Sequence, residues 1–114
     1  MTVAREDGTE LCERCRLADT VPTRLKGLLG RARLERGEGM LLSPAPAIHT
    51  CFMRFPIDAV FLDREHQVVG VAPELRPWRW ARRAGARAVL ELGAGEAERL
   101  GVRPGERLTY EAGT

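Results

Sequence analysis

The feature that most constrains the fold is how short the apolar runs of this sequence are. The longest uninterrupted run has only four or five residues, far below the roughly 20 that a membrane-spanning helix needs. Runs of this length suit the strands of a small sheet. Residues 1–7 are polar and contain no apolar segment of the kind that opens a signal peptide, so we expect a cytoplasmic protein.

The punctuation between these runs predicts one α+β domain spanning residues 1–114. Two short helices are expected: one begins after Asp19 or Thr20 and ends near Gly30, and the other covers 95–100. The remaining elements are strands of an antiparallel sheet that curls toward a small barrel. They are expected at residues 9–17, 40–42, 48–55, 57–62, 67–71, 87–92 and 107–111, with a turn at 63–66.

The stretch from His49 to Asp63, H-T-C-F-M-R-F-P-I-D-A-V-F-L-D, is the most specific part of the sequence. With the segments 24–30, 39–42 and 89–95 and the late Gly101, it resembles the bacterial and archaeal family called domain of unknown function 192. The resemblance covers about residues 10–111. It implies a small, mixed, barrel-like fold, and it implies no established activity, so the chemistry has to be argued from the residues.

Asp58 lies in a strand whose alternation places it on the same face as Val60 and Leu62. A carboxylate among apolar side chains must be paired or hydrogen-bonded, and Arg54 and Arg24 are the nearest cations expected. The first hypothesis is therefore a polar cleft that binds a small ligand or a protein. Its residues are His49, Thr50, Met53, Arg54, Asp58 and Arg24. The alternative is an internal ion pair that fixes the turn around Pro56.

Catalysis is not the favoured function of this predicted cleft. The sequence shows no recognisable order of nucleophile, base and orienting residue, and Ser43 is its only serine. An accessory or binding domain is expected instead. If the chain is an enzyme, Asp58 and His49 are the residues to test.

The second hypothesis is a zinc site. Cys12 and Cys15 form a C-x-x-C pair, and His49 with Cys51 adds two more donors, so a tetrahedral Cys₃His centre is conceivable. It requires a turn or bulge, because Cys12 and Cys15 of a straight strand face opposite ways. The alternative is apolar packing. A thioredoxin-like role is disfavoured because no helix begins at Cys12, and no other cofactor is expected.

The third hypothesis is an RNA-binding segment within residues 76–87, which hold five arginines, two tryptophans and no acidic residue. Such a mixture suits phosphates and stacked bases, and its residues are Arg76, Trp78, Arg79, Trp80, Arg82 and Arg83. An anionic membrane surface is also compatible. The favoured alternative is a surface connector with Trp78 or Trp80 pinned on the barrel, because no RRM, KH or helix-turn-helix pattern accompanies the segment. A monomer and a dimer paired through a strand edge are both open.

Overall fold

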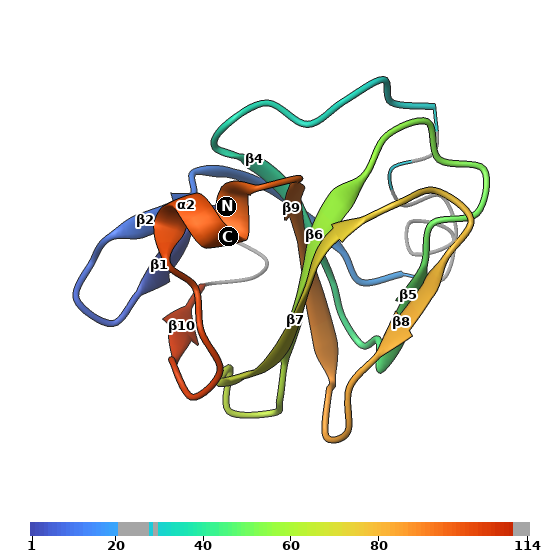
Figure 1. Ribbon diagram of the computed structural model, residues 1–114. Coiled ribbons are helices and arrows are strands. Elements are labelled where there is room, and N and C mark those ends of the chain that lie inside the picture. Colours follow the sequence, from blue (N-terminus) through green and yellow to red (C-terminus); the bar gives the residue numbers. More distant parts are fainter. Residues whose placement is uncertain (21–27, 29, 111–114) are drawn as a thin grey trace.

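The computed structural model describes residues 1–20, 28 and 30–110, and their strands form three sheets (Figure 1). The central sheet has the order β3-β4-β9-β6-β7, a three-stranded sheet has the order β10-β1-β2, and β5 pairs with β8. The strands are β1 Val3–Arg5, β2 Glu10–Cys12, β3 Arg14–Ala18, β4 Glu38–Leu42, β5 Ala47–His49, β6 Ile57–Leu62, β7 Val68–Leu75, β8 Trp80–Arg82, β9 Ala88–Gly93 and β10 Leu108–Thr109. The helix is α2, Glu96–Leu100.

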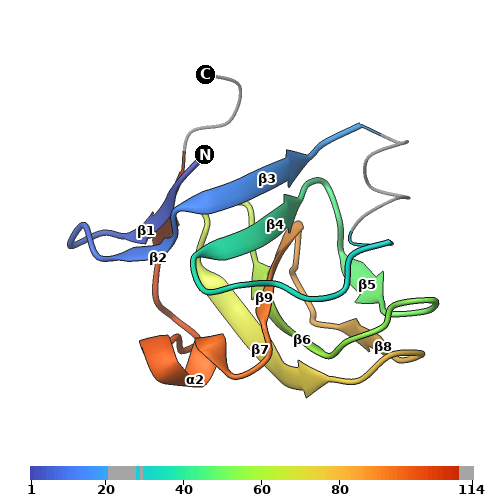
Figure 2. The same cartoon turned by 90° about the horizontal axis from the view of Figure 1, so that it is seen from above.

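The central sheet has a hydrophobic core on each face (Figures 1 and 2). The first core lies toward the three-stranded sheet and α2, and it includes Val3, Leu41, Val60, Leu90 and Leu108. The second core lies beneath β5 and β8, and it includes Ile48, Phe55, Ile57, Phe61 and Val89. Both faces are covered, which explains why every residue of β6 and β9 is buried.

The predicted barrel is wrong, because the sheets do not close. The central sheet ends at β3 and β7. The free edge at the start of β7 is taken up by the segment before β10, where Val68 N–H donates to Glu106 O and Gly105 N–H donates to Val68 O, each at 2.7 Å. The start of β7 is therefore paired with this segment and not with β3. The sheet is also not wholly antiparallel, since β3 and β4 run parallel.

Several predicted elements are confirmed. Alternation in β6 directs Ile57, Ala59 and Phe61 to the second core and Val60 to the first. The hairpin turn at 63–66 is held by the Asp63 carboxylate, which accepts the backbone N–H groups two and four residues later at 2.8 and 2.9 Å. The expected helix at 95–100 corresponds to α2, and Gly101 ends it at φ 68°, a conformation that favours glycine.

Other expectations need correction. The expected strand at 9–17 breaks at Glu13, because its two halves, β2 and β3, join different sheets. The expected strand at 48–55 ends at His49, and the segment 76–87, for which a connector was the favoured interpretation, contains β8. The described residues hold one helix of the two predicted, since the helix expected before Gly30 falls almost wholly outside them. No helix among the described residues is long and apolar enough to cross a membrane.

Candidate functional site

Asp58 is buried, as predicted, but its partners are backbone amides. One carboxylate oxygen accepts the N–H groups of Glu74 at 2.8 Å and Gly95 at 3.1 Å, and the other accepts that of Ala97 at 2.8 Å. Two of these donors lie at the start of α2, where N–H groups lack partners within the helix. The carboxylate therefore joins β6 to β7 and caps α2, which is a structural role.

The predicted polar cleft is not assembled. Arg54, the expected partner of Asp58, is exposed, and among the described residues it forms no ion pair with that carboxylate. His49 is exposed and its Nδ1 accepts the Cys51 N–H at 3.2 Å, whereas Met53 is buried in the second core. Asp58 lies on the opposite face of the central sheet, so the sheet separates these residues. Arg24 lies outside the described residues.

The four predicted zinc ligands are also separated. Cys12 and Cys15 both belong to the first core, because the break at Glu13 turns them to the same side. His49 and Cys51 lie at and just after β5, across the central sheet (Figure 1). Within the described ranges, no group of three or more His, Cys, Asp or Glu side chains comes together to hold a metal ion.

Thr50 joins the loop after β5 to the loop before β8. Its side chain is fully buried, and its hydroxyl donates to Arg76 O at 2.5 Å and accepts the Arg79 N–H at 2.9 Å. Its backbone N–H donates to Arg79 O at 2.8 Å, and its carbonyl accepts the Trp78 N–H at 3.0 Å. One polar residue thus fixes two loops that are about 25 residues apart in the sequence.

These two loops and the first residue of β8 expose three large aromatic side chains. Phe52, Trp78 and Trp80 are 70, 57 and 73% exposed. Phe52 lies against Trp78, with ring centroids 4.6 Å apart, and Trp80 lies against His49 at 5.1 Å. Phe52 and Trp78 have φ angles of 67° and 65°, a region that bulky residues rarely adopt and that clusters at functional sites.

The two chain segments that carry these rings are basic in composition. Residues 43–57 and 75–90 contain six arginines and no acidic residue. The rest of the chain then holds 12 of its 18 basic residues and all 16 acidic ones, a net charge of −4. We call seven exposed residues of this region the aromatic–arginine face. Its residues are Phe52, Arg54, Arg76, Trp78, Arg79, Trp80 and Arg82.

Five of the six predicted nucleic-acid residues are exposed, and the sixth is not part of the face. Arg83 is half-buried: its guanidinium donates to Val71 O at 3.2 Å and lies 5.2 Å from the centre of the Phe61 ring. Neither Trp78 nor Trp80 is pinned on the sheet, so the favoured connector interpretation is wrong on that point. Sequence reasoning missed Phe52, because strand alternation assigned it to a regular strand and no local signal marks the loop.

The comparisons with known proteins agree with the resemblance. The pattern of the family known as domain of unknown function 192, described as "Uncharacterized ACR", matches residues 2–110. The chain belongs to this family. A "UPF0127 protein" from Thermococcus sibiricus is 28% identical over 116 residues, which cover 97% of this chain and 75% of the relative.

Two solved structures have a similar fold. A protein of unknown function from Novosphingobium aromaticivorans is 30% identical, with a TM-score of 0.83 over 96% of this chain and 82% of its own. A protein from Sinorhizobium meliloti, named as a candidate transcription regulator, is 25% identical, with a TM-score of 0.80 over 95% of this chain and 89% of its own. The family and its relatives therefore establish the fold and leave the function to the site.

Proposed function

We propose that this protein is a non-catalytic module that binds single-stranded nucleic acid on the aromatic–arginine face. The observation that carries the proposal is the exposure of Phe52, Trp78 and Trp80 within a region that has six arginines and no acidic residue. Exposed rings cost hydration free energy in the unbound protein. An arrangement that keeps three of them in water favours a ligand with flat apolar faces and negative charge.

Nucleotide bases supply the flat faces. Stacking of a base on an aromatic side chain contributes about 1–3 kcal/mol, and it requires a ring face open to solvent. The Phe52–Trp78 and His49–Trp80 pairs are tilted, at 58° and 46° between ring planes, so neither pair stacks its own faces flush. Bases of a duplex are already stacked on each other, and this is why a single strand is the expected ligand.

Phosphates supply the negative charge. Arg54, Arg76 and Arg82 are exposed, and among the described residues none of them forms an ion pair. Their guanidinium groups are therefore available to phosphate oxygens. Binding through phosphates releases counterions, so the affinity is expected to fall steeply as salt is added.

The face is held in place before a ligand arrives. Ile48 and Ala81 anchor β5 and β8 on the second core, and Thr50 fixes the two loops. A preorganised site loses less conformational entropy on binding than a flexible one. The Sinorhizobium relative, whose name refers to transcription, agrees with a nucleic-acid ligand and adds modest weight.

The test is a titration of fluorescein-labelled oligouridine with the full chain, followed by fluorescence anisotropy over a series of salt concentrations. Trp80→Ala is expected to weaken binding about tenfold, because one stacking contact is removed. Arg82→Ala is expected to weaken binding and to reduce the slope of affinity against salt by about one phosphate contact. Arg103→Ala is the matched control, since it removes the same charge from an exposed position outside the face.

Three results would contradict the proposal. The first is an oligouridine affinity that neither Trp80→Ala nor Trp78→Ala changes. The second is equal affinity for a duplex of the same length. The third is no binding to oligouridine but binding to phosphatidylserine vesicles, which would assign the face to a membrane surface.

A further inference from the structure

Cys12 and Cys15 meet at a place where the neighbouring strand has no side chain. Gly39 of β4 is the register partner of Cys15, and a Cβ atom on Gly39 would lie 2.8 Å from the Cys12 sulfur. The absence of that atom leaves the space that the Cys12 side chain occupies. Both cysteines are buried, at 0 and 4% exposure, and both belong to the first core. The break at Glu13 therefore creates a dithiol that a continuous strand would not allow.

The two thiols are not equivalent. The Cys12 thiol donates to Gly37 O and the Cys15 thiol to Arg16 O. Interaction with Cys15 lowers the pKa of Cys12, and interaction with Cys12 together with burial raises the pKa of Cys15. The N-terminal ammonium, which donates to Cys15 O at 2.9 Å, adds a positive charge close to both. Cys12 is thus the better nucleophile of the pair, and Cys15 keeps its proton.

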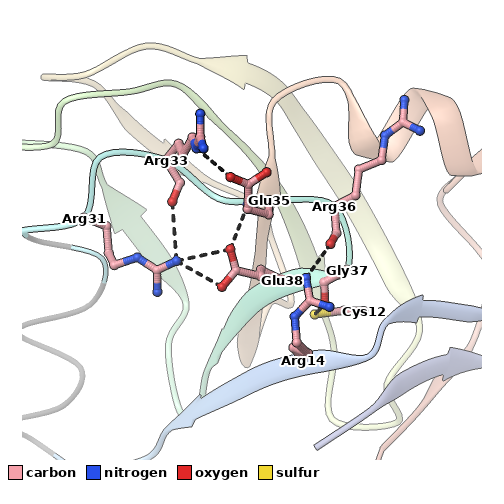
Figure 3. Close-up of polar contacts among 8 residues, drawn as sticks. All are labelled: Cys12, Arg14, Arg31, Arg33, Glu35, Arg36, Gly37 and Glu38. Carbon is pink, nitrogen blue, oxygen red and sulfur yellow. Dashed lines mark hydrogen bonds and ion pairs between the residues drawn. The ribbon is translucent and has the colours of Figure 1, made fainter.

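The Cys12 sulfur lies behind a surface hollow. The hollow has a volume of about 230 Å³ and is lined by Glu10, Leu11, Glu13, Arg36, Gly37 and Arg99. Gly37, which lines it, also accepts the Cys12 thiol at 3.5 Å (Figure 3).

The segment that carries Gly37 has ionic contacts within itself and a hydrogen bond to β3. Arg31 pairs with Glu38 at 3.1 Å and Arg33 pairs with Glu35 at 2.6 Å (Figure 3). In addition, Arg14 of β3 donates to Arg36 O at 2.8 Å. Because Arg14 lies between the two cysteines in sequence, this bond ties the wall of the hollow to the strand that carries Cys15.

From this geometry we propose that Cys12 and Cys15 form a redox-active dithiol that reacts with a small hydroperoxide entering from the hollow. The Cys12 thiolate attacks the O–O bond, which breaks to give a sulfenic acid on Cys12 and one hydroxide or alkoxide. The Cys15 thiol then attacks the Cys12 sulfur, and the S–O bond breaks. A disulfide forms and water leaves, so the protein loses two electrons and the peroxide gains them.

The test treats the reduced full-length chain with hydrogen peroxide, blocks the remaining thiols under denaturing conditions and digests the protein with trypsin without a reductant. Cleavage after Arg14 separates Cys12 from Cys15 unless a disulfide joins them. We expect residues 6–14 and 15–16 to be recovered as one linked species, with a mass lower by two hydrogens than the sum of the separate thiol peptides. Cys51, which is more exposed, serves as the internal control and is expected to be recovered blocked.

Two variants separate the roles of the thiols. Cys15→Ser should let dimedone trap a sulfenic acid on Cys12, and Cys12→Ser should leave Cys15 unreactive toward peroxide. Circular dichroism establishes that each variant is folded, and the wild-type digest tests the proposal without them. Oxidation of Cys51 while Cys12 and Cys15 are both recovered as blocked thiols would overturn it, and so would trapping on Cys15 in Cys12→Ser.

Discussion

Two buried carboxylates on neighbouring strands show how differently the same chemical group can be accommodated. Asp58 of β6 is fully buried, and Glu91 of β9 is 4% exposed. Glu91 is the register partner of Ala59, the residue after Asp58, so the two side chains lie close in the sheet and point to opposite faces. Asp58 accepts three backbone N–H groups. The described residues offer the Glu91 carboxyl no hydrogen bond.

The difference teaches that burial alone does not decide the charge of a carboxyl group. At Asp58 the amides of α2 and β7 replace the water that the carboxylate has lost. At Glu91 burial raises the pKa to about 8, and no compensating donor lies among the residues that the structure describes. The Glu91 carboxyl is therefore mostly protonated at neutral pH, whereas Asp58 has donors arranged for the anion.

The largest effect on the free energy of unfolding is expected at Asp58, whose carboxylate has three N–H donors. In Asp58→Asn one oxygen becomes an NH₂ group, which faces either the Ala97 N–H or the Glu74 and Gly95 N–H groups. We expect a loss of about 4 kcal/mol in the free energy of unfolding, because a buried donor is left without an acceptor. Urea denaturation measures this.

Asp63→Asn is the matched control for that experiment. The Asp63 carboxylate also accepts two backbone N–H groups, but a single oxygen takes both, so an asparagine can keep them. A loss below about 1 kcal/mol is expected there. Equal losses at Asp58 and Asp63 would show that the amides around Asp58 do not stabilise it.

Burial of the Glu91 carboxyl makes the stability of the protein depend on pH. The folded carboxyl keeps its proton up to about pH 8, whereas the unfolded one loses it near 4.5. The folded state binds more protons in this window, so stability falls as the pH rises through it, by up to about 1.4 kcal/mol per pH unit. Glu91→Gln should remove this dependence and should be the more stable protein at high pH. Urea denaturation at a series of pH values measures both, and identical pH profiles for the two proteins would contradict the comparison.

A smaller effect than at the two carboxyl groups is expected at Thr50, the third buried polar residue of the described part. Thr50→Val keeps the shape but removes the hydroxyl that serves Arg76 O and the Arg79 N–H. We expect a loss of about 1–2 kcal/mol and faster hydrogen exchange at the Arg79 amide. Thr50→Ser retains the hydroxyl and should keep both properties close to wild type. Slow exchange at Arg79 in Thr50→Val would show that the hydroxyl does not hold the loops.

Much of the fold could be predicted from local sequence. Alternation assigned the two faces of β6 correctly, and it placed Asp58 among buried residues. The turn at 63–66 and helix α2 were predicted because aspartate, glycine and charge patterns act over a few residues. The break at Glu13 could not be predicted, since it arises only when β2 and β3 pair with different strands.

The candidate site was predictable only in part. The basic, aromatic character of the segment 76–83 could be predicted, because its arginines and tryptophans are adjacent in sequence. Phe52 joins them through the hydrogen bonds of Thr50, a contact between loops far apart along the chain. The proposed cleft and the zinc set failed for one reason: their residues are close in sequence or chemistry, and the central sheet stands between them.

Most short strands, the turn at 63–66 and the burial of Asp58 follow from the sequence. They depend on the alternation of side chains along a strand and on local backbone preference. The tertiary structure alone decided what each polar group meets. Backbone amides from β7 and α2 reach Asp58, Gly39 leaves room for the Cys12 sulfur beside Cys15, and Thr50 brings Phe52 to Trp78. Partners of this kind come from distant segments, and only the packing of the sheets brings them within bonding distance.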